Sequence, residues 1–225
     1  MNRYTQFMLL RHGLPHQSKC LLGRTDPILT EQGWQQMQAS IASLQFDLII
    51  SSSLLRCYDF AEHIAKQKGL ILLINDAWKE LDFGRWDGQL IASLWEDEQH
   101  AYRQFWQEPF KHSPPQGESS AKFLARITHS IRQLSQQYLG QRVLIVTHSG
   151  VMRMTLAWLL NSVQQGNSHL SRVQLDHAAV LQFNTYIDEE ALLWPQLQGL
   201  NNPSVTQTVV TRHTETEVRD ENHLF

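Results

Sequence analysis

Two apolar segments of this chain each end in a histidine that is followed closely by a glycine. Residues 7–10 run directly into Arg11-His12-Gly13, and residues 143–146 run into Thr147-His148-Ser149-Gly150. We interpret both segments as buried β-strands whose last residues reach the C-terminal edge of a sheet, where open α/β sheets bind their ligands. Gly13 would let the backbone turn away at that edge and leave room for a ligand.

Taken alone, either histidine could equally well be an ordinary polar residue at the end of a strand, with its hydrogen bonds made within the protein and no role in binding a ligand. Two such histidines in the same sequence context are more simply explained by one shared pocket. The helix expected at 151–160 would also bring backbone N–H groups close to His148. We therefore predict that His12 and His148 face the same pocket.

The rest of the chain alternates strand-like and helix-like segments, which is typical of an α/β fold. Further strands are expected at 46–50, 70–74 and 178–186, with an edge strand at 191–197. Thr30 is expected to cap one helix, and Ser53 is expected to cap a second helix with Cys57 on its inner face. A long helix is expected from Ser119 or Ser120 to about residue 138.

One segment lies outside this alternation. Apolar and aromatic residues recur at helical spacing from Ile91 to Trp106, and a break rich in proline and glycine follows at 109–117. We expect one or two helices inserted at about 89–118 as a lid over the site, with the aromatic side chains forming core. The predicted organisation is a single domain over 1–200 and a polar tail at 201–225, because the tail has no apolar face.

Charge and cysteine content argue against several functional classes. The net charge of the 225 residues is −3, whereas a nucleic-acid-binding chain needs a basic face. Cys20 and Cys57 form neither a disulfide framework nor a metal-binding motif. No apolar run approaches the length of a membrane span or of a signal peptide. We expect a cytoplasmic protein that uses no metal ion or cofactor and binds neither nucleic acid nor membranes.

The sequence positions of two charged residues, Arg56 and Glu80, make them candidates for a functional site. Arg56 falls in the first turn of the helix expected after Ser53, where the helix dipole disfavours a cation. It either faces an anion together with the free N–H groups of that turn or is a solvated surface arginine. Glu80 begins the segment 80–88, in which acids and glycines are mixed with aromatic residues. Desolvation there would raise its proton affinity, as a general acid requires, although a turn with capping acids explains the segment equally well.

Together, Arg11, His12, Arg56, Glu80 and His148 suit phosphoryl transfer. Guanidinium groups bind phosphate through paired hydrogen bonds and stay charged at working pH. Their charge lowers the proton affinity of a neighbouring imidazole, so that one histidine can stay neutral and nucleophilic. Such a set could position a phosphoryl group and neutralise its oxygens without a metal ion, while Glu80 protonates the leaving alkoxide.

Five ordered motifs resemble those of the histidine phosphatase superfamily, the phosphoglycerate-mutase-like group, over roughly residues 5 to 185. They are Leu10-Arg11-His12-Gly13, Gly23-x-x-Asp26-x-x-Leu29-Thr30-x-x-Gly33, Ser51-Ser52-x-Leu54-x-Arg56, Glu80-x-x-x-Gly84 and Thr147-His148-Ser149-Gly150. The resemblance implies a three-layer α/β/α fold with a mostly parallel central sheet and helices on both faces.

The resemblance also implies a phosphohistidine mechanism on a small phosphorylated substrate. His12 would attack phosphorus, and Glu80 would protonate the leaving oxygen and then activate water. Asp82 is a fallback acid in the same segment. The phosphoryl group would be held by Arg11, Arg56, His148 and Ser149.

The loop after the first motif departs from the family pattern, in which many members have Glu directly after the triplet and Asn a few residues later. Those places hold Leu14 and Ser18. Substrate contacts are instead expected from this loop at Gly23, Arg24 and Thr25, with His16 as a further candidate. The last two motifs are closer to the phosphatase branches than to the glycolytic mutases, and most similar to the α-ribazole-5′-phosphate phosphatases of cobalamin biosynthesis.

The sequence therefore favours a phosphomonoesterase. A phosphoglycerate mutase, which returns the phosphoryl group to its substrate, is an alternative enzyme. A non-catalytic sensor of phosphorylated metabolites is an alternative of another class. A metal hydrolase is less well supported, because the histidines and acids lack the spacing of metal ligands. For an enzyme that depends on neutral His12 and protonated Glu80, we expect a bell-shaped pH profile.

Overall fold

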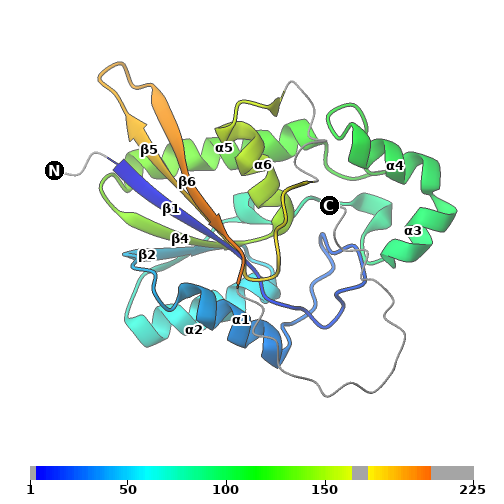
Figure 1. Cartoon of the computed structure of the whole chain (residues 1–225), viewed down its shortest axis with the longest axis horizontal. Helices are drawn as coiled ribbons and strands as arrows, with labels where there is room; N and C mark the ends of the chain where they lie inside the picture. Colours follow the sequence, from blue (N-terminus) through cyan, green and yellow to red (C-terminus); the bar gives the residue numbers. More distant parts are fainter. Residues whose placement is uncertain (1–3, 164–171, 204–225) are drawn as a thin grey trace.

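The computed structural model describes residues 4–163 and 172–203 and contains one six-stranded sheet in the order β3-β2-β4-β1-β5-β6 (Figure 1). Strands β3, β2, β4 and β1 run parallel, whereas β5 and β6 are antiparallel to their neighbours. The predicted mostly parallel sheet is therefore confirmed. The strands are β1 (Tyr4–Arg11), β2 (Leu48–Ser51), β3 (Leu72–Ile74), β4 (Arg142–Thr147), β5 (Val180–Ile187) and β6 (Leu193–Asn201).

Helices cover both faces of the sheet. Helices α1 (Glu31–Ile41) and α2 (Leu55–Lys68) lie on one face, and α5 (Ser120–Gln137) and α6 (Ser149–Leu159) lie on the other (Figure 1). The side chains of β1 alternate between these layers. Its first and third apolar residues, Phe7 and Leu9, pack with α5 and α6, whereas Met8 and Leu10 pack with α1 and α2. This explains why the whole run 7–10 is apolar, and it confirms the three-layer α/β/α fold.

The register of β1 against β4 brings the two strand-end histidines together. Arg11 lies opposite Thr147, and the backbone N–H of His12 donates to the carbonyl of Thr147 at 2.9 Å. The two strands thus end at the same level of the sheet. The ring centroids of His12 and His148 are 5.3 Å apart.

Of the two predicted helix caps, the one at Thr30 is confirmed. Thr30 Oγ1 accepts the N–H of Gly33 at 3.0 Å, and Ser119 caps α5. The prediction for Ser53 is wrong, because its hydroxyl donates to Asp76 at 2.7 Å. The free N–H of Leu55 at the start of α2 is instead accepted by the carboxylate of Asp26 at 2.8 Å, from a loop far away in the sequence.

Strands β2, β3, β5 and β6 each begin two residues later than the sequence predicts, and hydrogen bonds explain the late start of the first two. The carboxylate of Asp47 accepts hydrogen bonds from the backbone and the guanidinium of Arg142, and β2 begins directly after it. The N–H of Leu70 donates to the carbonyl of Ala65 and completes the C-terminal cap of α2, so β3 begins only at Leu72.

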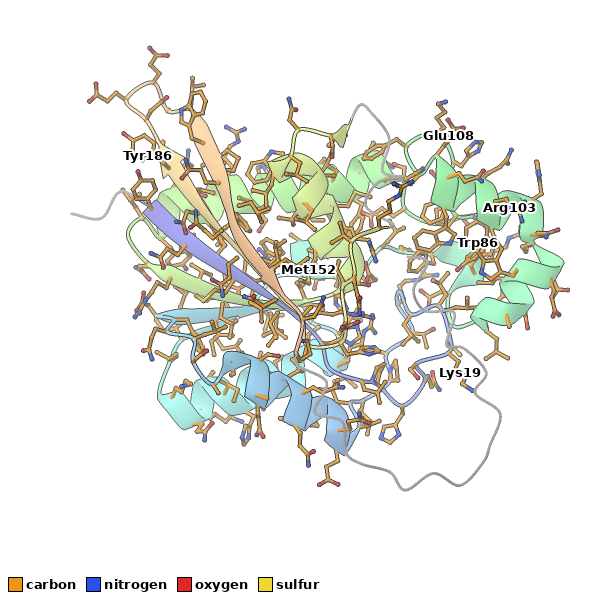
Figure 2. All side chains as sticks on the ribbon, in the orientation of Figure 1. Lys19, Trp86, Arg103, Glu108, Met152 and Tyr186 are labelled. Atoms are coloured by element: carbon orange, nitrogen blue, oxygen red, sulfur yellow. The ribbon has the colours of Figure 1, made fainter. Side chains whose placement is uncertain are left out.

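The predicted insertion contains α3 (Ile91–Asp97) and α4 (Gln99–Gln107), which follow two short 3-10 helices, η1 (Asp76–Trp78) and η2 (Gly84–Trp86). Exposed Arg103 and Glu108 mark its outer side, whereas Trp86 lies beneath it and Met152 lies in the core on α6 (Figure 2). Of the predicted tail, only 201–203 fall within the described residues. No helix in the described part of the chain is long and apolar enough to cross a membrane.

Candidate active site

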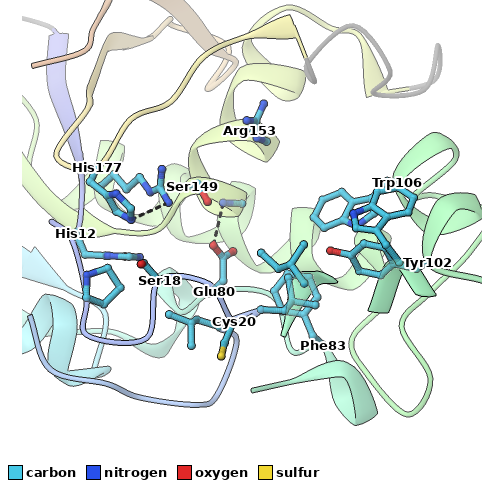
Figure 3. Close-up of a pocket in the computed structure, with 17 residues that line it drawn as sticks. His12, Ser18, Cys20, Glu80, Phe83, Tyr102, Trp106, Ser149, Arg153 and His177 are labelled. Atoms are coloured by element: carbon cyan, nitrogen blue, oxygen red, sulfur yellow. Dashed lines mark hydrogen bonds between the residues drawn. The ribbon is translucent and has the colours of Figure 1, made fainter. Parts of the chain in front are cut away.

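A cavity of about 150 Å³ lies at the C-terminal ends of β1 and β4 (Figure 3). Its polar part comes from the end of β1, from Glu80, from α6 and from the segment before β5. Its apolar part comes from the insertion and from the loop after β1. The lining residues are Arg11, His12, Pro15, Ser18, Cys20, Leu21, Leu22, Glu80, Phe83, Ile91, Trp95, Tyr102, Trp106, Ser149, Gly150, Arg153 and His177.

His12 is held as a neutral imidazole with one nitrogen free of a proton. Its Nδ1–H donates to the carbonyl of Gly13 at 2.9 Å, which leaves the lone pair on Nε2. The side chain is 5% exposed, and burial together with the charges of Arg56 and Arg11 holds its pKa well below the usual value of 6.5. The residue therefore has the protonation state of a nucleophile.

Arg11 presents a buried N–H donor at the cavity. Nη1 donates to the carbonyl of Leu175 and Nη2 donates to Nε2 of His177 at 3.3 Å, whereas buried Nε has no hydrogen-bond partner among the described residues. Burial lowers the pKa of Arg11 to about 10, against an opposing effect of Glu80, so the guanidinium stays charged at neutral pH. A half-buried cation with an unused, buried N–H donor suits an anionic ligand.

His177 is a third histidine of the site that the sequence analysis missed. It lies in the turn before β5, and its ring centroid is 5.8 Å from that of His12. Burial and the charge of Arg11 lower its pKa to about 3, so it is neutral and accepts the hydrogen bond from Arg11 (Figure 3). In the sequence its one signal is its position directly before the strand expected at 178–186, whereas the other two histidines of the site follow strands.

His148 lies behind His12, fully buried, and is not among the residues that line the cavity. Arg56 Nε donates to its Nδ1 at 3.3 Å, and its Nε2–H therefore faces Ser52 Oγ, at 2.9 Å. Burial and the charge of Arg56 hold the pKa of His148 well below 6.5. The two histidines are neighbours, but in this arrangement only His12 borders the cavity.

Arg56 occupies the first turn of α2 as predicted, but it is fully buried, which excludes the alternative of a solvated arginine. Its guanidinium donates to the carbonyls of Leu22, Gly23 and Thr25 at 2.8 to 3.0 Å, and it lies 3.4 Å from the carboxylate of Asp26. Arg56 thus fixes the loop after β1, and it does not itself line the cavity.

The expected substrate-contacting residues Gly23, Arg24 and Thr25 also lie outside the cavity lining. The side chain of Arg24 is 67% exposed and pairs with Asp82 at 3.1 Å. The backbone N–H groups of Arg24 and Thr25 donate to Asp87. These contacts join the loop after β1 to the segment 80–88, and they commit the fallback acid Asp82 to a structural pair.

Glu80 borders the cavity and is fixed by the backbone on two sides. Its Oε1 accepts the N–H of Leu81 at 3.0 Å, and its Oε2 accepts the N–H of Gly150, in the first turn of α6, at 3.0 Å (Figure 3). A Cβ atom on Gly150 would overlap the Glu80 carboxylate. Gly150, the glycine of the fifth motif, therefore leaves the room that the carboxylate of the predicted acid occupies.

Arg153 is a second functional residue that the sequence analysis missed. It lies four residues after Ser149 on α6, so both side chains lie on the face that borders the cavity. Its Nη1 donates to the carbonyl of Val173 at 3.1 Å. Burial lowers its pKa to about 10, opposed by Glu80, so the site gains another cation at neutral pH.

The loop after β1 departs from the family pattern at Leu14 and Ser18, and the structure places these two residues differently with respect to the cavity. Ser18 lines the cavity, whereas Leu14 and exposed His16 do not. A Cβ on Gly13 would overlap the backbone of Gly33, so Gly13 makes room for α1 rather than for a ligand. Among the described residues no group of three or more His, Cys, Asp or Glu side chains is arranged to hold a metal ion.

Comparisons with known proteins agree with this arrangement. A family model described as the histidine phosphatase superfamily (branch 1) matches residues 7–196. A bifunctional protein of Mycobacterium tuberculosis is 32% identical over 190 residues, which cover 82% of this chain and 51% of that protein. The chain therefore spans about half the length of this curated relative.

Solved structures show the same fold. A mycobacterial glucosyl-3-phosphoglycerate phosphatase is 26% identical, with a TM-score of 0.73 over 86% of this chain and 96% of the other. An α-ribazole phosphatase from Shigella flexneri is 24% identical, with a TM-score of 0.71 over 88% of this chain and 96% of the other.

Proposed function

Because the chain belongs to the histidine phosphatase superfamily (branch 1), we propose that it is a metal-independent phosphomonoesterase that forms a phosphohistidine at His12. The observation that carries this proposal is the state of His12. Its Nδ1–H is held by the carbonyl of Gly13, its Nε2 is unprotonated, and it borders a cavity that is also lined by Arg11 and Glu80. A nucleophile, a cation and an acid meet there.

In the first step, the Nε2 lone pair of His12 attacks phosphorus. An N–P bond forms, the P–O bond to the alcohol breaks, and the leaving oxygen takes the proton of Glu80. Arg11, Arg153 and the N-terminus of α6 provide positive charge around the transferring group. Direct contact of phosphoryl oxygens with Arg56 or His148 stays a prediction.

In the second step, the carboxylate of Glu80 takes a proton from water while the water oxygen attacks phosphorus. The N–P bond breaks, inorganic phosphate leaves, and the lone pair returns to Nε2 of His12. Glu80 is then protonated and ready for the next substrate. One carboxyl group serves both steps because the first step leaves it as the carboxylate that the second step needs, and the backbone N–H groups of Leu81 and Gly150 keep it in place between them.

For the specific substrate we propose α-ribazole 5′-phosphate, and with it a role in cobalamin biosynthesis. The form of the Glu80 and His148 motifs supports this choice. The cavity supports it further, because an aromatic wall adjoins the polar end that would receive the phosphate. D-Ribose 5-phosphate, which lacks the benzimidazole ring, is the matched comparison.

The test is phosphate release from a panel that contains both compounds, phosphoserine and 3-phosphoglycerate. We expect wild type to release phosphate with EDTA present, and His12→Ala to lose at least about a thousandfold in kcat/KM. The exposed His129 on α5 offers a matched control, His129→Ala, which should keep full activity. Quenched wild-type reactions should show a phosphoryl group on the peptide that contains His12.

Other outcomes identify the alternatives. Isomerisation of 3-phosphoglycerate without net phosphate release would show a mutase. Binding of phosphorylated compounds without turnover would show a sensor. Loss of activity in EDTA, with recovery on adding zinc, would contradict the metal-independent mechanism.

A further inference from the structure

Four aromatic side chains from the insertion and the segment before it form one wall of the cavity. We call this wall, made by Phe83, Trp95, Tyr102 and Trp106, the aromatic chamber (Figure 3). It is continuous with the polar end that holds His12 in the same cavity. A group attached to a phosphate bound at His12 would therefore extend toward the chamber.

Two of the four aromatic side chains of the chamber are not fully buried in the hydrophobic core. The sequence predicts that the aromatic residues of 91–106 form core, and two of them, Tyr102 and Phe105, are indeed only 1% and 2% exposed. Trp95 and Trp106 are only half-buried, and both line the cavity. Each indole thus keeps surface on the cavity side that the fold does not cover.

The rings are packed edge to face. Trp95 and Tyr102 have centroids 5.0 Å apart at 89°, and Tyr102 and Trp106 have centroids 5.9 Å apart at 79°. This packing fixes the orientation of the rings and offers a new planar group both ring faces and ring edges, the contacts that aromatic pairs favour. Burial raises the pKa of Tyr102 to about 12, so its hydroxyl stays neutral.

The charges of the lining side chains indicate that the group bound in the chamber is itself uncharged. The side chains that α3 and α4 contribute to the described lining, Ile91, Trp95, Tyr102 and Trp106, carry no charge, while Arg11, Glu80 and Arg153 lie around the polar end. A second anionic group would find no counter-ion among them.

We infer that the chamber receives an uncharged planar ring carried by the leaving group, so that the substrates are phosphate monoesters of alcohols with an aromatic ring. This inference rests on the proposed phosphatase function and adds the residues that select the substrate. The ring is held by Trp95 and Trp106, while the phosphoryl group is held at the other end of the cavity. The selection therefore acts on binding of the leaving group and leaves the reacting atoms unchanged.

The test compares three esters with the same kind of primary alkoxide leaving group: 2-phenylethyl phosphate, 2-cyclohexylethyl phosphate and ethyl phosphate. The first two match in size and differ in the aromatic ring. We expect wild type to prefer the phenyl ester over the cyclohexyl ester by about threefold to tenfold in kcat/KM, mostly through KM. Equal values, or a preference for the cyclohexyl ester, would overturn the inference, while phosphate release from ethyl phosphate would still support the phosphatase function.

Substitutions of the chamber tryptophans test whether these residues cause the preference for the phenyl ester. In Trp95→Leu and Trp106→Leu the ratio of phenyl to cyclohexyl kcat/KM should fall toward one. The matched control is Trp194→Leu, because Trp194 is exposed on β6 and pairs with Tyr186, at the end of the sheet away from the cavity. It should keep the wild-type ratio. An unchanged ratio in both chamber variants would contradict the inference.

A binding measurement covers the case in which a chamber variant folds poorly. In folded His12→Ala protein, calorimetry should show tighter binding of 2-phenylethyl phosphate than of 2-cyclohexylethyl phosphate, by the same factor as in KM. Equal binding of the two esters would also count against the ring site. Absence of turnover of all three esters by wild type would instead refute the phosphatase function itself.

Discussion

At the scale of single residues, the site depends on backbone groups that orient His12 and Glu80. The carbonyl of Gly13 holds the proton of His12 on Nδ1, and the missing side chain of Gly150 leaves the space for the Glu80 carboxylate. Neither contact involves a second side chain. Backbone groups therefore set the orientation of both proposed reacting groups, which is a more rigid arrangement than side-chain pairs provide.

The pH dependence of the reaction belongs at this scale. Burial and the nearby charges of Arg56 and Arg11 depress the pKa of His12, so protonation, which removes the nucleophile, should occur only well below pH 6.5. We expect the acidic limb of kcat/KM, which reports the free enzyme, to have its midpoint below 6.5. The measurement is kcat/KM against pH, corrected for the second ionisation of the phosphate monoester, whose pKa is about 6. An acidic limb at or above 6.5 after that correction would show that His12 is not held neutral as described.

At the scale of elements, α5 positions the segment that contains Glu80. Arg126 on α5 donates to the carbonyls of Ala77, Lys79 and Glu80 and forms a two-point ion pair with Glu118. These bonds attach an irregular segment to a long, well-packed helix. The proposed acid thus lies between two helices, with α5 holding its carbonyl and α6 its carboxylate.

Replacing Arg126 by lysine should loosen this attachment, because an ammonium group cannot reproduce the planar fork of a guanidinium. We expect the free energy of unfolding of Arg126→Lys to fall by about 1 to 3 kcal/mol and kcat to fall with it. Urea denaturation and steady-state kinetics measure the two effects. Arg142→Lys is the control, because Arg142 forms a similar two-point pair with Asp47 at the opposite end of β4, on the surface. A loss of kcat in the control as large as in Arg126→Lys would show that the effect is not specific to the Glu80 segment.

At the scale of the whole molecule, three neutral imidazoles lie around one site, with His12 and His148 buried and His177 half-buried. The pKa values of His12, His148 and His177 are all lowered, with burial as the first cause in each. In the unfolded chain these groups protonate near pH 6.5, whereas in the folded chain they stay neutral to lower pH. Between these values the unfolded state binds more protons, so stability falls as the pH falls.

We therefore expect unfolding free energy to be independent of these groups above pH 6.5 and to decrease below it, by about 1.4 kcal/mol per pH unit for each histidine. His177→Gln removes one such group, so its stability should depend less steeply on pH than that of wild type between pH 6.5 and about 4. Urea denaturation at several pH values gives the slopes. The control His129→Gln replaces an exposed histidine and separates the effect of burial from that of removing any histidine. Identical slopes for wild type and His177→Gln would contradict the lowered pKa of His177.

The sequence predicts those parts of this molecule that depend on neighbours along the chain. The strand-end position of His12 and His148 and the cap at Thr30 follow from local patterns, and the structure confirms them. The cap of α2 could not be predicted in this way, because Asp26 reaches Leu55 from another loop. Arg153 and His177 were missed for the same reason, since only the packing of α6 and β5 against β1 brings them to the cavity.

The antiparallel direction of β5 brings the turn before this strand to the cavity, where its residues can be exchanged. Because β5 runs against β1, pairing Val180 with Leu10, its first residues arrive at the edge where the parallel strands end. The turn 172–178, which includes His177 and Ala178 with a left-handed φ of 62°, therefore meets the cavity without being part of the strand ladder. In protein engineering, this turn offers a place to exchange residues above the nucleophile while every hydrogen bond between strands is kept.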